Sequence, residues 1–179
     1  MELQNVLEAR RSIRKYDEAK KVTKEQIDEI IKAGILAPTW KNSQTARYYV
    51  ALTDEGIEKV RAGLPDFNAN NTKGASAYIV NTFIANRSGY EKDGTPSTEL
   101  AHNEWGVYDL GLANENMLLK AAELGLATLV MGIRDAKALK EVLEIPEDQI
   151  VVSVIALGYA AAEPAMPKRK EVADVASFF

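Results

Sequence analysis

The stretch that decides the fold is residues 107–131, which read VYDLGLANENMLLKAAELGLATLVM. They contain most of a helix that we predict over residues 99–124, with apolar side chains on nearly every side. A helix of that kind lies in a core or between subunits. Gly125 caps the helix, and the apolar run Ala127 to Met131 is predicted to be a strand. The centre of the fold is therefore a long buried helix that leads directly into a strand.

The other elements follow from hydrophobic periodicity and from residues that start or end helices. Thr23 followed by Gln26 is a capping-box pattern that predicts the start of a helix, and Pro38 ends it. The same reasoning predicts helices from Leu3 into Arg10 and Arg11 and over 54–64 and 136–143, and strands over 47–52, 77–85 and 150–159. Because helices and strands are interleaved without a regular βαβ rhythm, the pattern favours an α+β fold over a doubly wound sheet.

Composition excludes several kinds of catalysis. The chain has 179 residues, which indicates one domain, and it contains no Cys and one His. It can form no disulfide framework, thiolate nucleophile or Cys-rich metal site, and a Ser-His-Asp triad would have to use His102. We expect no metal site and no ionisable catalytic side chain. If the protein is an enzyme, a cofactor supplies its chemistry.

The net charge and the hydropathy of the chain indicate which partners and which cellular location to expect. The formal net charge is −4 and the sequence pI is about 5.2, which does not favour nucleic acid or an anionic membrane as a partner. No stretch approaches the ~20 apolar residues that cross a bilayer. The first five residues lack the basic and apolar regions of a signal peptide. We therefore expect a cytoplasmic protein without nucleic-acid or membrane partners.

Two segments stand outside the predicted core. Residues 86–97 form the longest loop, and long loops in compact domains are usually functional or mobile. From Ala160 onward the chain carries Pro164, Pro167 and a basic cluster and ends in Phe178-Phe179. Such a tail is hard to bury within its own domain. We predict a single domain over 1–179 in which residues 160–179 form a C-terminal arm that reaches another subunit.

Three polar clusters could bind a ligand. The cations of Arg10-Arg11-Ser12-Ile13-Arg14 and of Lys168-Arg169-Lys170 suit a phosphate group, since a guanidinium matches two phosphate oxygens. The amides of Asn42 and Gln44, in the loop after Pro38, suit the edge of a heterocycle. No Rossmann or Walker glycine pattern is present, so side chains would hold any phosphate. The alternatives are a solvated helix end, a charged tail and an ordinary helix-to-strand connection.

Taken together, these motifs resemble the nitroreductase family of FMN-dependent oxidoreductases. The opening R-R-S-I-R-K-Y of residues 10–16 is similar to the family's N-terminal signature, and residues 37–44 resemble its A-P-S-x-x-N-x-Q loop. Residues 116–127 resemble the central-helix run, Met131-Gly132 the strand-end glycine, and Gly158-Tyr159 with the basic cluster at 168–170 the late segment. The motifs span essentially the whole chain in the family's order.

The resemblance implies an intertwined homodimer with a central mixed β-sheet flanked by helices, and an FMN at each interface touched by both subunits. Arg14 would approach the N1/O2 edge of the flavin, Asn68 or Asn71 its pyrimidine side, and the backbone of Met131-Gly132 its N5/O4 edge. The other subunit would supply residues from Pro38 to Asn42. The implied cofactor-binding set is Arg10, Arg11, Ser12, Arg14, Pro38, Thr39, Trp40, Asn42, Gln44, Asn68, Asn71, Met131, Gly132, Lys168 and Arg169, in which Arg10, Ser12, Lys168 and Arg169 would hold the phosphate and ribityl chain.

The activity implied is a ping-pong transfer of hydride from NADH or NADPH, through the flavin, to a nitroaromatic, a quinone or a similar small electron acceptor. A reductive dehalogenase or a flavin-destroying enzyme of the same fold is one alternative. A flavin-storage protein without significant turnover and an anion-binding regulatory module are others. Trp40, or a lid around Trp105 and Tyr108, is expected to narrow the site and favour flat acceptors.

Overall fold

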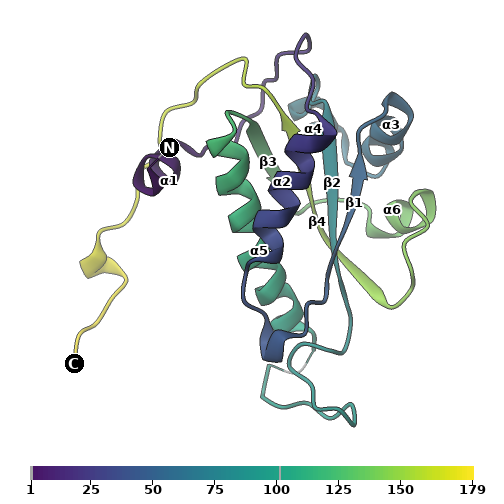
Figure 1. The fold of residues 1–179 in the computed structure, drawn as a ribbon, viewed down its shortest axis with the longest axis vertical. Coiled ribbons are helices and arrows are strands. Elements are labelled where there is room, and N and C mark those ends of the chain that lie inside the picture. Colours follow the sequence, from purple (N-terminus) through teal and green to yellow (C-terminus); the bar gives the residue numbers. More distant parts are fainter. Residues whose placement is uncertain (1, 101) are drawn as a thin grey trace.

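A four-stranded sheet forms the centre of the computed structural model, which describes residues 2–100 and 102–179 (Figure 1). The strand order is β1-β2-β4-β3, and every pairing between these strands is antiparallel. The sheet therefore differs from the mixed sheet that we expected. Parallel pairing in the described residues is limited to an isolated bridge between Ser12 and Thr128, because the N-terminal segment touches the sheet only briefly. The strands are β1 (Ala46–Ala51), β2 (Ala77–Ile84), β3 (Ala127–Met131) and β4 (Gln149–Gly158).

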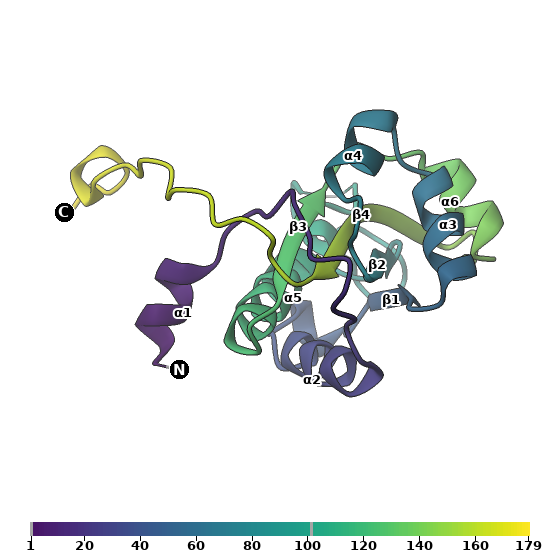
Figure 2. The same ribbon diagram turned by 90° about the horizontal axis from the view of Figure 1, so that it is seen from above.

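Helices cover both faces of the sheet (Figure 2). On one face lie α2 (Lys24–Ile35) and α5 (Glu104–Glu123), which pack against each other and against the strands. On the other face lie α3 (Asp54–Ala62) and α6 (Ala136–Val142). The remaining helical elements are the short α1 (Leu3–Ala9), α4 (Asp66–Asn71), η1 (Trp40–Asn42) and η2 (Val172–Asp174).

The two central strands are buried on both faces. In β2 the side chains of Tyr78 and Val80 belong to the core beneath α3 and α6, whereas Ala77 and Ile79 belong to the core beneath α2 and α5. This alternation follows from the two-residue period of a strand. Strands buried on both sides appear in the sequence as continuous apolar runs, which is why 77–85 and 150–159 were recognisable.

Most predicted helices and strands are confirmed, and the residues expected to cap the helices do so. Thr23 Oγ1 accepts from the Gln26 backbone N–H at 3.3 Å, and the Gln26 side chain accepts from the Thr23 backbone N–H at 3.0 Å. The predicted start of the long helix at residue 99 is wrong, because α5 begins at Glu104 after Asn103 in a left-handed conformation. Within that predicted start, Ala101 lies outside the described residues. The prediction also lacked α4.

Both termini extend from one side of the body. The N-terminal segment lies along β3, where the Ile13 backbone N–H donates to the Thr128 carbonyl oxygen at 2.9 Å. The C-terminal arm leaves β4 beside this segment, and the Ala161 backbone N–H donates to the Lys15 carbonyl oxygen at 2.9 Å. Beyond it, residues 162–179 are exposed and project past α1 (Figures 1 and 2). Among the described residues, no helix is long and apolar enough to span a bilayer.

Candidate functional site

A cationic cleft of about 430 Å³ lies where the N-terminal segment meets the start of β3. Its lining includes Arg10 and Arg11 from the segment, Gly125 and Thr128 from the turn and strand that follow α5, and one carboxylate, Glu163, from the arm. Arg10 is held loosely, since its Nε lies 4.0 Å from the Glu115 carboxylate, and Arg11 donates to the Arg10 carbonyl oxygen at 2.8 Å. Both guanidinium groups retain donors that can bind an anion in the cleft.

The other predicted phosphate ligands lie farther out. Arg14 and Ser12 are exposed, and Arg14 donates to the Ser12 carbonyl oxygen at 3.4 Å. Lys168 and Arg169 stand on the exposed arm, where Arg169 donates to the Pro167 carbonyl oxygen at 3.2 Å. None of the hydrogen bonds or ion pairs in the described residues joins these arm cations to residues 10–14. Within one chain, the two basic clusters remain separate.

At the other end of β3, Asn68 and the strand-end glycine are brought together. The Asn68 side chain is 7% exposed, and its Nδ2 donates to the Ile133 carbonyl oxygen at 2.8 Å. Gly132 is exposed, and a Cβ placed there would have no atom within 4 Å, so a planar group can approach this backbone closely. Asn71 is half-buried on the same short helix. The edge of β3 thus leads from the cationic cleft to an open stretch of backbone.

The loop from Pro38 to Gln44 lies elsewhere, at the lower end of α2 in Figure 1. Its backbone is strained, because Lys41, Asn42 and Gln44 have φ angles of 44°, 56° and 48°. Non-glycine residues seldom adopt this left-handed conformation, and clusters of them mark functional loops. Asn42 and Gln44 are exposed, and Gln44 is partly fixed by a 3.2 Å hydrogen bond from its backbone N–H to Thr39 Oγ1.

A buried carboxylate that the sequence did not point to holds this loop. Asp109 of α5 is 4% exposed, and its two oxygens accept from the Trp40 backbone N–H at 3.1 and 3.0 Å. The Ser88 hydroxyl also donates to Asp109 at 2.7 Å and lies 2.8 Å from the Ser43 hydroxyl. Asp109 therefore joins α5, the strained loop and residues 86–97. The only signal for it in the sequence is an aspartate within an otherwise apolar stretch of helix.

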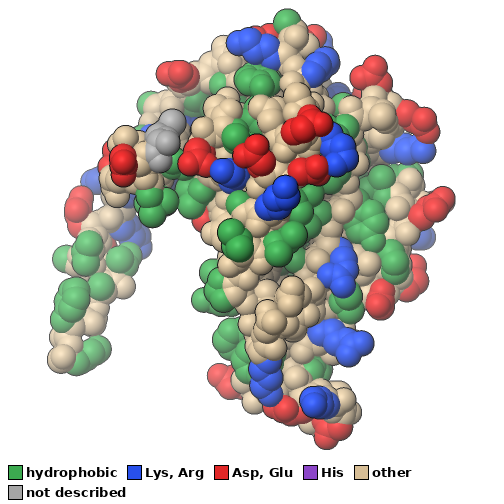
Figure 3. Space-filling view, in the orientation of Figure 1, with side chains coloured by type: hydrophobic (Ala, Val, Ile, Leu, Met, Phe, Trp, Pro, Cys, Tyr) green, Lys and Arg blue, Asp and Glu red, His purple; other side chains and the backbone are tan. Residues whose placement is uncertain are grey.

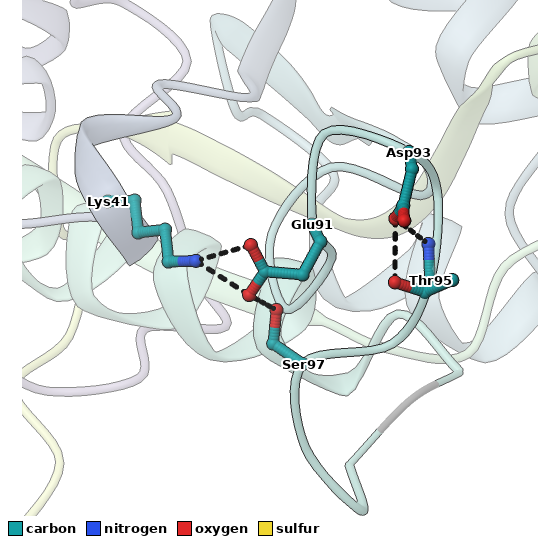
Figure 4. Close-up of polar contacts among 5 residues, drawn as sticks. All are labelled: Lys41, Glu91, Asp93, Thr95 and Ser97. Atoms are coloured by element: carbon teal, nitrogen blue, oxygen red, sulfur yellow. Dashed lines mark hydrogen bonds and ion pairs between the residues drawn. The ribbon is translucent and has the colours of Figure 1, made fainter.

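Aromatic side chains cover the same region. The rings of Trp40 and Trp105 lie 4.7 Å apart, and Tyr108 packs edge-on against Trp105 at 5.4 Å. Lys41 Nζ donates to the Glu91 carboxylate at 2.8 and 3.0 Å, and Ser97 Oγ donates to it at 2.6 Å (Figure 4). The hydrogen bonds from Lys41 and Ser97 hold the pKa of Glu91 below its ordinary value. The loop over residues 86–97 is thereby closed against η1.

The fold and the ordered motifs along it define the class of protein. The chain belongs to the nitroreductase family, whose model matches residues 7–159. An Archaeoglobus fulgidus protein provisionally named NADH dehydrogenase/NAD(P)H nitroreductase is 34% identical over 158 residues, which cover 86% of this chain and 83% of that protein. The family resemblance that the motifs indicate is confirmed.

Solved structures agree on the fold. A provisionally named nitroreductase from Exiguobacterium sibiricum 255-15, solved in complex with FMN, has a TM-score of 0.86 at 22% identity and covers 100% of this chain and 98% of its own. A provisionally named NADH oxidase from Clostridium acetobutylicum has a TM-score of 0.75 at 28% identity, with coverages of 96% and 97%. The nitroreductase-like fold is therefore confirmed.

Proposed function

We propose that this protein is an FMN-dependent oxidoreductase that passes hydride from NADH or NADPH to a small electrophile such as a quinone or a nitroaromatic. The observation that carries the proposal is the arrangement along β3, in a chain of the nitroreductase family. A two-arginine cleft lies at the start of this strand. The open backbone at Gly132 and the buried amide of Asn68 lie at its end.

The residues present fit FMN. Arg10 and Arg11 offer charge-assisted donors for the phosphate group in the cleft. Gly132 leaves room for the ring to approach the backbone, and the Asn68 side chain, held through its Nδ2, keeps its oxygen as an acceptor. FMN, when bound, supplies the hydride chemistry. The protein's part is to bind, orient and surround it, which requires neither cysteine nor histidine.

We further propose that two chains assemble into the functional unit. Apolar side chains stand in solvent along the arm (Figure 3), and Phe178 is 87% exposed. A groove of about 570 Å³ between α1, α2 and α5 has Leu3, Val6 and Leu36 among its apolar lining and charged residues such as Lys32 and Glu123 beside them, and Leu36 is 82% exposed. Burying this surface against a second copy would be favourable at roughly 25 cal/mol per Å². The partner would also supply the strained loop and the arm cations that one chain keeps away from its own cleft.

Cofactor binding is the first test. Apoprotein titrated with FMN is expected to gain bound-flavin absorbance, and NADH or NADPH is expected to be consumed rapidly when a quinone is added. A flavin-storage protein would bind FMN but oxidise NAD(P)H slowly. A regulatory anion-binding module would leave the flavin free, and that result would refute the proposal.

The cleft arginines are tested by a double variant, Arg10→Ala with Arg11→Ala. Each lost charge-assisted hydrogen bond is worth about 1.5–3 kcal/mol, so the dissociation constant for FMN is expected to rise at least about a hundredfold. Arg61→Ala with Lys137→Ala removes the same charge from α3 and α6 and serves as the control. Equal FMN affinity in the two double variants would show that the cleft does not hold the cofactor.

Acceptor preference is proposed to depend on the contacting indole rings of Trp40 and Trp105. Trp40 and Trp105, 4.7 Å apart, would narrow the space available to an acceptor and favour flat molecules. Trp40→Ala is expected to raise the rate with a bulky quinone relative to a flat one. An unchanged ratio of the two rates in this variant would contradict the assignment.

A further inference from the structure

Arg134 is a half-buried cation without a counter-ion. Its Nη1 donates to the Gly132 carbonyl oxygen at 2.9 Å, and its Nη2 donates to the Val151 carbonyl oxygen. Its Nε is buried and has no hydrogen-bond partner. None of the ion pairs found among the described residues includes it, whereas Arg61, another half-buried arginine, lies 3.5 Å from the Glu58 carboxylate. Because a guanidinium is always charged in proteins, holding this charge away from water without a carboxylate is costly.

The bonds to Arg134 and Asn68 fix the orientation of two successive peptide groups. The Gly132 carbonyl accepts from the Arg134 side chain, and the Ile133 carbonyl accepts from Asn68 Nδ2 at 2.8 Å. In a planar trans peptide the N–H points opposite to the C=O. The Ile133 backbone N–H therefore points away from the Arg134 guanidinium, and the Arg134 backbone N–H points away from the Asn68 amide. No hydrogen bond in the described chain uses either N–H, and the Ile133 side chain is 65% exposed.

This segment is held firmly on its other side as well. The Asp135 backbone N–H donates to the Gly63 carbonyl oxygen at 2.8 Å, and the Asp135 carboxylate caps α6 through the Ala138 backbone N–H at 2.9 Å. The two free N–H groups are thus fixed before any ligand arrives. Donors fixed in this way stabilise negative charge because they need no reorganisation when the charge develops.

We propose that Arg134 is a positioning residue for the flavin. It fixes the Gly132–Ile133 peptide with the Ile133 N–H toward the ring, next to the Ile133–Arg134 peptide that Asn68 fixes, and its unpaired charge favours the reduced, more negative cofactor over the oxidised one. This inference rests on the proposed function. A purely structural alternative is that Arg134 only braces the turn after β3 against Val151 of β4.

Three substitutions separate charge from hydrogen bonding. Arg134→Lys keeps the charge and can reach one carbonyl, Arg134→Gln keeps a donor without the charge, and Arg134→Met keeps neither. Arg61→Met is the matched control, because it removes a half-buried arginine from α3. For each variant, three quantities are measured: the melting temperature of the apoprotein, the dissociation constant for oxidised FMN, and the midpoint potential of bound FMN.

In Arg134→Met the dissociation constant is expected to rise about tenfold for oxidised FMN and about a hundredfold for reduced FMN. The tenfold difference between the two forms lowers the two-electron midpoint potential by about 30 mV. Arg134→Gln should lower the potential similarly with a smaller loss of affinity. Arg134→Lys and Arg61→Met should both keep the potential of the unaltered protein.

The results distinguish this inference from the function on which it rests. If the unaltered apoprotein does not bind FMN, the proposed function fails. If it binds FMN but Arg134→Gln leaves the potential unchanged, the role of the charge is refuted. A lower melting temperature in Arg134→Met, with affinity and potential unchanged, would leave Arg134 as a structural brace and overturn the inference. Should Arg134→Met fail to fold, the Lys and Gln variants decide the outcome through the difference between their potentials.

Discussion

Replacing Asp109 by alanine should loosen the strained loop more than any other single change in that region. The substitution leaves the Trp40 backbone N–H without its acceptor and removes the 2.7 Å hydrogen bond of the Ser88 hydroxyl, which keeps its contacts with the Ser43 and Thr45 hydroxyls. The unsatisfied Trp40 N–H costs about 1–3 kcal/mol, and the lost hydrogen bond from Ser88 to a charged group contributes about 1.5–3 kcal/mol. Removing a buried carboxylate recovers part of that cost, because its desolvation is relieved. We expect a net loss of about 3 kcal/mol, which for a chain of this size lowers the melting temperature by roughly 6–12 °C.

The two tryptophans of the chain report on this change directly. Trp40 and Trp105 are in ring contact, and Trp40 is the residue whose backbone N–H bonds Asp109. Urea unfolding followed by tryptophan fluorescence therefore detects the loop, while far-UV circular dichroism detects the whole fold. In Asp109→Ala the fluorescence transition should precede the circular-dichroism transition. Non-coincident transitions of this kind indicate local opening before global unfolding.

Asparagine at the same position provides the control. The side-chain amide introduced by Asp109→Asn can accept from the Trp40 backbone N–H through its oxygen and donate to the Ser88 hydroxyl through its nitrogen, so a loss of only about 1 kcal/mol is expected. If Asp109→Ala costs less than this and leaves the fluorescence unchanged, Asp109 does not hold the loop.

Three other outcomes are expected. A Cβ at Gly106 would lie 2.2 Å from the buried ring of Phe83. Gly106→Ala should therefore destabilise the protein by about 1–3 kcal/mol in urea unfolding, although alanine has the higher helix propensity. A gain in stability would contradict this expectation. Burial raises the pKa of Tyr16 well above its ordinary value, so its proton is held more tightly in the folded state. The resulting stability is complete below about pH 10 and is lost as the pH rises further, and the urea midpoint should fall less between pH 9 and pH 11 in Tyr16→Phe. Removing residues 162–179 should change the unfolding free energy of the chain body by less than about 1 kcal/mol, since these residues are exposed. It should also reduce the mass measured by light scattering, and an unchanged oligomer would count against the arm as an interface.

The extent to which the sequence predicts the fold depends on how local each signal is. The capping box at Thr23 and Gln26 involves residues three positions apart, and the buried strand at 77–85 is a single apolar run, so both were recognisable. Helix α4 was missed because its sequence DFNANN has asparagines, which are weak helix formers, and no apolar period. The start of α5 was placed too early because apolar periodicity does not reveal that Asn103 adopts a left-handed conformation.

The candidate site depends even more than the fold on contacts between residues far apart in the sequence, which local signals do not reveal. Arg10, Arg11 and the Met131-Gly132 pair, which stay predicted cofactor ligands, could be named as candidates because family motifs are continuous in sequence. Asp109 contacts Trp40 across 69 positions of the chain, and no local pattern indicates such a pair. Arg134 appears as an ordinary charged residue before a helix cap, and only its bonds to two carbonyl groups distinguish it.

The N-terminal segment along β3 covers part of a strand edge that could otherwise pair with another molecule. β3 is an outer strand, and an exposed outer strand can pair with the same strand of another molecule. The bond from the Ile13 backbone N–H to the Thr128 carbonyl oxygen occupies part of this edge. Ribosomes synthesise residues 10–16 long before residues 127–131, so the nascent chain already carries the segment that covers β3 when that strand emerges. A chain shortened past Ile13 would expose the edge during synthesis and should form insoluble aggregates.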